Sequence, residues 1–472
     1  MPKILNLIIM VKNCFNLVVL ALFVMTINNS CTTEKKSQFT GIDGEVKLIT
    51  LDPGHFHAAL VQKYMYVQVH PDVFVYAPDG DDLNEHIKRI EAYNTRAEEQ
   101  TGWNLEVYRG DDFFERMIAE KKGNVMVIAG NNRKKTEYIK TALEAGINVL
   151  ADKPMVINSE NFEVLKQAFE VAAQKGVLLY DIMTERFEIA TILQREFSQL
   201  PEVFGTLEKG TPDNPAVITE SVHHFFKEVS GDALKRPAWF YDVQQQGEGI
   251  VDVTTHLVDL VQWGCFPEVI LSPQDVNIIS AKRWTTDINR EQFTASTSLT
   301  DFPEYLMNCV SDDLLHVYAN GEINYTLKDV HAKVIVIWNY MAPEGGGDTH
   351  YSIMRGSNAN LIIRQGAEQN YVPALFIEPS ANIDSEAFEK TLTDNLNKLQ
   401  SKYPGVDIKK LEKGWEVVVP QKYHVGHEAH FGQVTERFLQ YLVDGKLPEW
   451  EVPNMITKYY TTTKALEIAS EQ

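Results

Sequence analysis

The stretch from Val125 to Met155, VMVIAGNNRKKTEYIKTALEAGINVLADKPM, contains the pattern that decides the fold. It begins with a continuous apolar run, Val125 to Ala129, which is typical of a strand covered on both faces of a sheet. Apolar residues then recur at helical spacing from Thr136 to Glu144, and Gly146 ends this helix. A second short apolar run, Asn148 to Ala151, follows. Strand, helix and strand in this order predict one unit of a parallel sheet.

The same alternation extends outward from this unit in both directions. Further short strands are expected at 46–51, 73–76, 105–108 and 177–181, with amphipathic helices between them. One of these helices is expected to follow the first strand and to run from His57 to Val69. Repeated alternation of this kind predicts a doubly wound parallel sheet, so residues 46–181 are expected to form a Rossmann-like domain.

From residue 182 the pattern changes. Between 274 and 364, short strand-like segments follow one another with turns between them, and they include 291–299 and 304–311. Successive strands without long helices predict a mainly antiparallel sheet. Helical patterns return at 383–402, 428–443 and 453–470. The fold class expected is therefore α/β, with a C-terminal α+β domain over residues 182–472.

The N-terminus has the features of an export signal. Two lysines precede an apolar run from Phe15 to Ile27, which is shorter than the roughly 20 residues of a membrane-spanning helix. Cys31 follows the run after three residues, which resembles a bacterial lipoprotein signal, although two asparagines replace the usual small residues before the cysteine. We therefore expect residues 1–30 to be a lipoprotein-type signal peptide, and 31–45 to be a tether. Plain secretion is the alternative.

These N-terminal features predict an exported protein at the periplasmic or cell-surface side of a membrane, held there only by a lipid on Cys31. The formal net charge of -21 argues against nucleic acid and anionic membrane surfaces as partners, because both would repel the protein. A small neutral or cationic ligand is compatible with this charge. After removal of the signal and lipidation of Cys31, two cysteines remain, Cys265 and Cys309, and no spacing among the four cysteines suggests a zinc cage.

Polar residues collect where the predicted strands end. In open parallel sheets, ligands bind at the carboxyl ends of the strands. The candidates at these ends are Asp52, Gly54 and His57, Asp79, Gly130, Asn131 and Asn132, and Asp152, Lys153 and Pro154.

A second informative stretch is Gly247 to Trp263, GEGIVDVTTHLVDLVQW. Its glycines predict a tight turn, and the apolar residues after them predict a helix. Asp252 and His256 are four residues apart, so both lie on one face if the helix has begun by Asp252. The carboxylate can then hold one ring nitrogen and leave the other free as a base. The alternative is a helix-terminal carboxylate beside a histidine with a purely structural role.

Both stretches resemble the family of glucose/fructose oxidoreductase, inositol dehydrogenase and MocA (Gfo/Idh/MocA). Asp152-Lys153-Pro154 stands where this family typically has Glu-Lys-Pro, after a segment similar to its Ala-Gly-Lys-His-Val. The segment from Lys235 to Trp263 resembles the family's Arg-Pro-x-Trp, Gly-Gly-Gly and Asp-x-x-x-His elements in order and spacing. The resemblance covers roughly residues 46–264, with weaker support near 425–470.

The resemblance implies a nicotinamide-dependent oxidoreductase that acts on a hydroxyl group of a sugar, glycoside or polyol, with NAD or NADP as cofactor, and we also expect a homo-oligomer. Carried over by position, His256 is the base, Asp252 orients it, and Lys153 is the active-site lysine that stabilises alkoxide character. Two alternatives remain open: a redox-neutral glycosidase or lyase that uses bound NAD, and a sugar-binding protein without catalysis.

The phosphate-binding loop departs from the family pattern. A Gly-x-Gly-x-x-Gly loop normally follows the first strand, whereas this chain has Asp52-Pro53-Gly54-His55-Phe56-His57 with one glycine. Asp52 would repel a phosphate at close range. Asp79 is a candidate for the ribose hydroxyls and favours NAD, although its neighbours make it equally a turn residue. The altered loop and the export signal together suggest a nucleotide held so tightly that it stays bound.

Three further residues are candidates for substrate contact. Arg186 stands where family members often have a substrate-facing arginine, with a surface ion pair to Glu185 as the alternative. Trp239 and Tyr241 suit the face of a sugar ring, although core packing is the default for aromatic residues.

Histidines are concentrated in two places. His55 and His57, together with Asp52, form a minor alternative as metal ligands, but no metal is expected. His424, His427 and His430 recur every third residue, and aromatic packing or sugar contact is favoured over a metal for them; their role stays open.

Overall fold

The computed structural model describes residues 39–229 and 232–471, so the predicted signal peptide and Cys31 lie outside the described residues. Among the described helices, none combines the length and the apolar character needed to cross a bilayer. The predicted lipid anchor therefore stays a prediction. Cys265 and Cys309 are both free thiols, the first partly buried and the second exposed.

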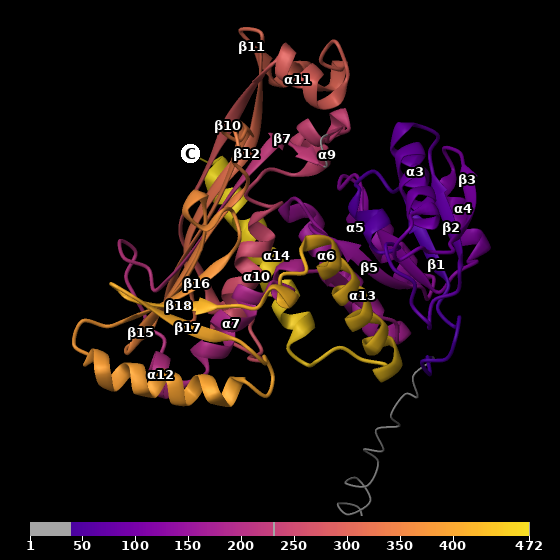
Figure 1. Ribbon diagram of the computed structural model, residues 1–472. Helices are drawn as coiled ribbons and strands as arrows, with labels where there is room; N and C mark the ends of the chain where they lie inside the picture. Colours follow the sequence, from indigo (N-terminus) through magenta and orange to yellow (C-terminus); the bar gives the residue numbers. More distant parts are fainter. Residues whose placement is uncertain (1–38, 230–231, 472) are drawn as a thin grey trace, which may run out of the picture. The chain divides into compact units, whose positions relative to one another are not determined.

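The N-terminal domain is built on a six-stranded sheet in the order β3-β2-β1-β4-β5-β6, and all neighbouring strands are parallel (Figure 1). The strands are β1 (Leu48–Leu51), β2 (Asp72–Ala77), β3 (Asn104–Arg109), β4 (Val125–Ile128), β5 (Asn148–Asp152) and β6 (Leu179–Ile182). Every residue of β1, β4 and β5 is buried, as expected for parallel strands covered on both faces. The doubly wound sheet is therefore confirmed, with its switch point between β1 and β4.

The helices of this domain follow the prediction except after β1. They are α3 (Asp81–Thr95), α4 (Phe113–Glu120), α5 (Lys135–Glu144) and α6 (Ser159–Lys175). The helix predicted over 57–69 is wrong, because α2 spans only His57–Leu60. The indole nitrogen of Trp103 donates to the carbonyl oxygen of Gln62 at 2.6 Å, and the Arg96 guanidinium donates to the carbonyl oxygen of Lys63 at 2.5 Å. Side chains thus take the carbonyls that a longer helix would use.

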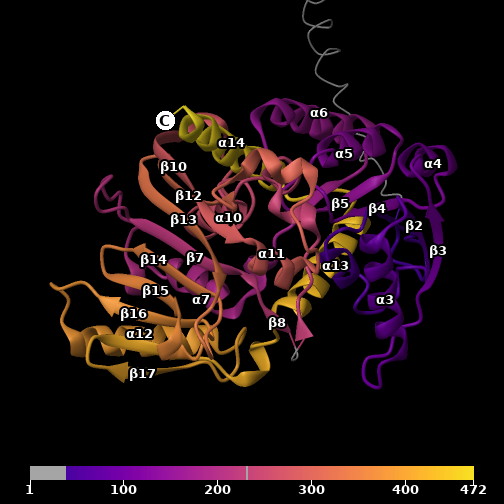
Figure 2. The ribbon, with the colours of Figure 1, turned by 90° about the horizontal axis from the view of Figure 1, so that it is seen from above.

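The C-terminal domain contains a ten-stranded sheet with the path β10-β12-β13-β7-β14-β15-β16-β18-β17, and β11 pairs with β12 (Figure 2). Its strands are β7 (Val217–Phe226), β10 (Val276–Asn289), β11 (Val310–Ser311), β12 (Leu314–Leu327), β13 (Val330–Met341), β14 (Thr349–Arg355), β15 (Ala359–Gln365), β16 (Ala374–Pro379), β17 (Asp407–Leu411) and β18 (Gly414–Val418). Only β13 and β7 pair in parallel along this path, so the predicted antiparallel character is confirmed.

Two strands predicted in this domain are wrong. Residues 291–299 fall largely in the helix α11 (Arg290–Thr297), and residues 304–311 begin with the 3-10 helix η4 (Glu304–Cys309). A capping box starts α11, in which the side chains of Asn289 and Gln292 each accept a hydrogen bond from the other residue's backbone N–H. This local pairing favours a helix over a strand.

The last two helices of the chain return to the N-terminal sheet. Aromatic residues of α13 (His427–Asp444) and α14 (Glu451–Ser470) belong to the same apolar core as the six parallel strands, and Figures 1 and 2 both show α13 beside this sheet. The buried Lys458 of α14 binds both Asp181 on β6 and Asp259 on α10 (Thr254–Cys265) at 2.8 Å. These contacts fix α10 against the ends of the parallel strands.

Candidate active site at the ends of the parallel strands

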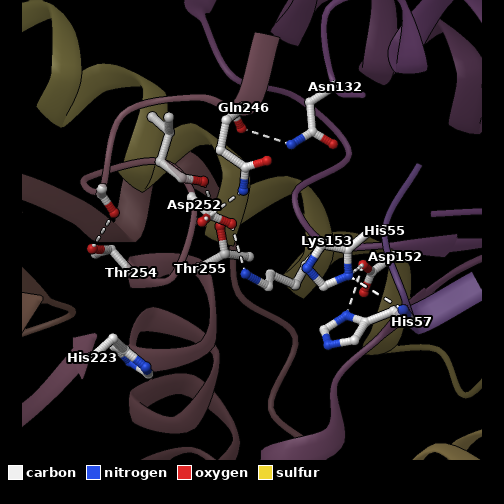
Figure 3. A network of polar contacts seen from close by, with 12 residues as sticks. His55, His57, Asn132, Asp152, Lys153, His223, Gln246, Asp252, Thr254 and Thr255 are labelled. Carbon is white, nitrogen blue, oxygen red and sulfur yellow. Dashed lines mark hydrogen bonds and ion pairs between the residues drawn. The ribbon is translucent and has the colours of Figure 1, made fainter. Parts of the chain in front are cut away.

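The centre of the site is a short ion pair between Lys153 and Asp252. Lys153 directly follows β5, and its Nζ donates to Asp252 Oδ1 at 2.6 Å (Figure 3). Both side chains are largely buried, with 11% and 6% of their surfaces exposed. The peptide bond between Lys153 and Pro154 is cis. Two residues 99 positions apart, both predicted from the sequence, are therefore in direct contact.

The turn before α10 positions Asp252. Gly247 has a φ of +96°, and a Cβ on Gly249 would lie 1.8 Å from the carbonyl oxygen of Ala319, so each of these two positions requires glycine. The side-chain amide of Gln246 donates to Asp252 Oδ2 at 3.0 Å. Both carboxylate oxygens of Asp252 thus have partners.

The predicted pairing of Asp252 with His256 is wrong. The helix α10 begins at Thr254, after Asp252, so the condition for a shared helical face is not met. The oxygens of Asp252 bind Lys153 and Gln246 instead. Within the described residues, the buried Nδ1 of His256 has no hydrogen-bond partner. His256 therefore carries one ring nitrogen whose partner is not another described protein group.

Burial dominates the electrostatics of His256. It lowers the pKa of the His256 imidazole well below its usual range, and the nearby positive charge of Lys153 lowers this pKa further. The ring is therefore neutral at neutral pH. A neutral imidazole can accept a proton, which is the form that a general base requires.

A second cluster lies on the other side of Lys153. His57 Nδ1 is 2.9 Å from Asp152 Oδ2, and His55 Nδ1 is 3.9 Å from the same oxygen (Figure 3). The buried ammonium group of Lys135 donates to the backbone carbonyl of Asp152 at 3.1 Å. The structure thus brings together the predicted residues His57, Asp152 and Lys153. It also adds His55, which the sequence had suggested only as a minor alternative.

The loop after β4 is held by the C-terminal domain. The side-chain amide of Asn131 donates to Gln245 Oε1 at 2.7 Å, and that of Asn132 donates to the carbonyl oxygen of Gln246 at 2.6 Å. A Cβ on Gly130 would lie 2.2 Å from the carbonyl oxygen of Asp52, so the loops after β1 and β4 touch here. Gln245 and Gln246 were not predicted from the sequence, because each lies 114 residues from its partner in the loop after β4.

Two cavities flank the loop after β1. One of about 220 Å³ includes Asp52, Asp79 and Gly80 at the ends of β1 and β2. The other, of about 210 Å³, includes Gly54 and His55. Three cationic side chains of α3 and of the segment before η2 (Ala238–Tyr241) also line the second cavity, namely Arg89, Lys235 and Arg236.

A dinucleotide fits part of this arrangement. Asp79 borders the first cavity, and Arg109 Nη1 holds its carboxylate at 2.7 Å, so an acceptor for ribose hydroxyls is in place. The backbone N–H groups of Gly54 and His55 bind the carbonyl oxygens of Asp52 and Ala129, at 2.8 and 3.1 Å, and are not free for a phosphate. The second cavity also contains the acidic side chains of Asp81, Asp82 and Glu85, and Lys235 is paired with Asp81 at 3.3 Å. Arg89 forms no ion pair with another described residue, so it is the cation best placed to neutralise phosphate charge there.

The side chain of Asp52 repels a phosphate less strongly than its formal charge suggests. Burial, and secondarily the negative charge of Asp82, raise the pKa of Asp52 to about 6. Its carboxyl group therefore becomes neutral under mildly acidic conditions, and the repulsion expected from the sequence applies only above that pH.

The three predicted substrate contacts have different surroundings. Trp239 lines the second cavity, and its indole N–H donates to Asp82 Oδ2 at 2.7 Å. The prediction that Arg186 contacts substrate is wrong, because its side chain is buried and its guanidinium binds Asp259 at 2.6 Å and Glu451 at 2.9 Å. Arg186 lines neither of the two cavities described above. The prediction that Tyr241 contacts substrate is also wrong. Its side chain is 2% exposed, and its hydroxyl group pairs with Ser296 Oγ in the apolar core.

The three regularly spaced histidines have different surroundings. His427 begins α13 and packs its ring 5.4 Å from the ring of His57, whereas His424 precedes the helix and His430 is buried in it.

A further cluster was not predicted as a unit. Asp348 Oδ1 lies 2.9 Å from His224 Nδ1, and its Oδ2 lies 3.3 Å from His223 Nδ1. The paired histidines were visible in the sequence, but Asp348 follows a loop 124 residues later.

Comparison with known proteins agrees with the fold and the geometry. Residues 57–181 match the family model described as "Oxidoreductase family, NAD-binding Rossmann fold", and residues 193–470 match the model "Putative oxidoreductase C terminal domain". The first match begins at His57, after the altered loop. Among curated proteins, none matches the chain.

Solved structures give the same result. The crystal structure of a "putative oxidoreductase" from Parabacteroides merdae is 61% identical, with a TM-score of 0.91, over 92% of this chain and 99% of that one. Two more distant structures share the fold alone. The structure of a "putative oxidoreductase" from Thermotoga maritima is 15% identical, with a TM-score of 0.57 over 90% of this chain and 99% of that one. Levoglucosan dehydrogenase in complex with NADH is 12% identical, with a TM-score of 0.57 over 90% and 97%.

The two family models together cover most of the described chain, and Lys153 lies in the region matched by the first model and Asp252 in the region matched by the second. The resemblance noted in the sequence is thus confirmed at the level of the family. The chain belongs to the Gfo/Idh/MocA family of oxidoreductases with an NAD-binding Rossmann domain.

Proposed function

We propose that the protein oxidises a hydroxyl group of a sugar, glycoside or polyol with a bound NAD or NADP. The single observation that carries this proposal is the position of the Lys153–Asp252 ion pair, directly after β5 and beside the switch point between β1 and β4 of the Rossmann sheet. When bound, the nicotinamide accepts a hydride from the carbon that bears the hydroxyl group. The proton of that hydroxyl group must go to the protein, and His256 is the neutral base proposed to take it.

Lys153 has a separate role in this proposal. Its ammonium group is fixed by Asp252 at 2.6 Å and carries a positive charge into a largely buried site. A fixed positive charge stabilises negative charge that develops on the reacting oxygen, because the surrounding protein screens it less than water does. Asp252 acts through Lys153 and is therefore a positioning residue. Trp239, which lines the second cavity, is the proposed apolar contact for a sugar ring.

We also propose that the nucleotide stays bound through turnover. The reduced nucleotide must then give its hydride to a second carbonyl compound, or return it to the oxidised substrate, before the next turnover. Asp79 would bind the ribose of the nucleotide, and Arg89 would neutralise phosphate charge in place of the missing glycine amides. Outside the cytoplasm no soluble pool of nicotinamide is expected, so a freely exchanging cofactor would not be regenerated.

Purified full-length protein should release about one nicotinamide nucleotide per chain on denaturation, detected by absorbance and mass spectrometry. Arg89→Ala should reduce this content, because it removes a cation from the cavity lining. Lys88→Ala is the matched control, since Lys88 lies on the same helix with its side chain exposed. Equal loss in both variants would contradict the assignment of Arg89.

The alternatives are separate outcomes of the same assay. Turnover of a sugar without added NAD and without net NADH fits the proposal, and cleavage of a glycosidic bond under these conditions would identify a redox-neutral glycosidase or lyase. Stoichiometric NADH formed from added NAD would identify an ordinary exchanging dehydrogenase. Protein that neither contains nor binds a nucleotide would be a sugar-binding protein without this catalysis.

Export is a separate proposal that rests on the apolar run before Cys31. We propose that the mature protein begins at Cys31 and carries acyl chains there. Mass spectrometry of the N-terminal peptide and partition into detergent should show this. An unmodified N-terminus at another residue, or a full-length chain in the cytoplasm, would contradict it.

A further inference from the structure

The strongest unassigned feature is the cluster of His55, His57 and Asp152. Each residue offers one ligand atom, and these three atoms lie within 4.8 Å of one another. No other such group of His, Cys, Asp or Glu side chains occurs in residues 39–229 and 232–471. We propose that His55, His57 and Asp152 form a binding site for one divalent transition-metal ion, with zinc as the reference ion. This inference goes beyond the proposed function and does not depend on it.

The distances suit a small ion. Ligand atoms of a tetrahedral zinc ion lie about 2.0–2.2 Å from the metal, and hence about 3.3–3.6 Å from one another. The separations of the histidine Nδ1 atoms from Asp152 Oδ2, 2.9 and 3.9 Å, lie on either side of this range. His55 Nδ1 also accepts a hydrogen bond from the backbone N–H of His57 at 3.3 Å, so His55 would exchange this contact for the ion. With this exchange, small side-chain adjustments would bring all three atoms to one ion. The rings of His55 and His57 are edge to face, with centroids 4.0 Å apart, so the two imidazoles approach from different directions.

The ligands sit on well-supported parts of the fold. Asp152 is the last residue of β5, and the carbonyl of the same residue is held by Lys135. His57 begins α2, is 8% exposed, and packs against the ring of Phe431 on α13 at a centroid distance of 4.6 Å. Metal sites depend on such support, because it fixes the ligands before the ion arrives. Two histidines and a carboxylate are also a donor set that suits first-row divalent ions.

The charges around the cluster are close to balanced. Three carboxylates, those of Asp52, Asp152 and Asp252, act on the buried ammonium group of Lys135. The positive charges of Lys135, Lys153 and Arg236 act on His57. Lys153 is itself paired with Asp252 at 2.6 Å, so its charge is partly compensated. A divalent ion would therefore be held by its three ligand atoms and not by an excess of negative charge.

The ion would be incompletely enclosed. Three protein ligands leave at least one coordination position, the arrangement typical of catalytic rather than structural zinc sites. His55 lines the cavity of about 210 Å³, so the remaining position can accept water or an oxygen atom of a ligand that enters there. The carboxylate of this cluster was predicted to be that of Asp52, which is wrong. Asp152 lies 95 residues after His57 in the sequence, so their contact could not be predicted from spacing.

The plain alternative is a hydrogen bond between His57 and Asp152 with no metal. Untagged full-length protein should be stripped with a chelator, reloaded with zinc chloride, and analysed for metal content and for affinity by calorimetry. We expect one zinc ion per chain. Replacement of zinc by cobalt should give the visible absorption of a tetrahedral or five-coordinate site.

His57→Ala and Asp152→Asn should each weaken zinc binding by about 100-fold or more, since each removes a ligand rather than a supporting residue. His70→Ala is the matched control, because His70 also neighbours an aspartate, Asp72, at 3.6 Å but lies outside the cluster. Circular dichroism and thermal melting verify that the variants fold. Absence of stoichiometric zinc, or unchanged affinity in Asp152→Asn, would overturn the proposal. Nucleotide content measured on the same samples reports the proposed function separately.

Discussion

Lys153→Ala is expected to lower turnover by about 10²–10⁴, the range that acid/base groups and fixed charges supply in active sites. The structure supports this size of effect because the ammonium group is 11% exposed and held in a single short ion pair. Water cannot easily replace a charge fixed in this way. Turnover should be measured on the sugar that the wild-type protein oxidises, with nucleotide content as the measure of intact folding.

Lys140→Ala is the matched control for this variant. Lys140 lies on α5 and pairs with Glu144 at 2.6 Å, on the surface and away from the cavities. Its removal should leave turnover near the wild-type level, since exposed helical ion pairs contribute only about 0.3–0.5 kcal/mol. If Lys153→Ala retained most of the activity while Lys140→Ala behaved as expected, Lys153 would not be an active-site residue.

Asp252→Asn tests whether Asp252 acts through Lys153. Because the two side chains are in direct contact, their effects on turnover should not add. The double variant should be little worse than Lys153→Ala alone. Additive losses would instead point to an independent role for Asp252, such as the orientation of His256 that the sequence had suggested.

Much of the fold could be predicted because strands buried in a parallel sheet are recognisable in the sequence as short apolar runs. All residues of β1, β4 and β5 are buried and most of them are apolar, so a short apolar run identified each strand without knowledge of its neighbours. The helix after β1 could not be predicted in the same way. Its early end depends on Trp103, which reaches the carbonyl oxygen of Gln62 from a position 41 residues away.

The main residues of the site were predicted from the sequence, but the contacts between them were not. Lys153 and Asp252 were found through separate motifs, yet their contact crosses 99 residues and depends on how the two domains meet. Spacing instead favoured a contact between Asp252 and His256, because a helix was assumed to start two residues too early. Arg186 was assigned by position, whereas its partners Asp259 and Glu451 become neighbours only when α10 and α14 pack together.

His256→Gln is expected to lower turnover by about 10²–10⁴ while leaving the protein folded, because glutamine fills similar space but cannot take a proton at neutral pH. The pH profile should identify the cause. Burial, followed by the charge of Lys153, lowers the pKa of His256 well below 6.5, so the base form persists as the pH falls. In the wild-type protein, kcat/KM should therefore be flat from pH 8 to 6.5 and decline only below that range, as His256 becomes protonated. His316→Gln, at a histidine bound to Asp287 outside the site, should keep both the rate and the profile. An acid limb centred at or above pH 6.5, or near-full activity of His256→Gln, would show that another group is the base.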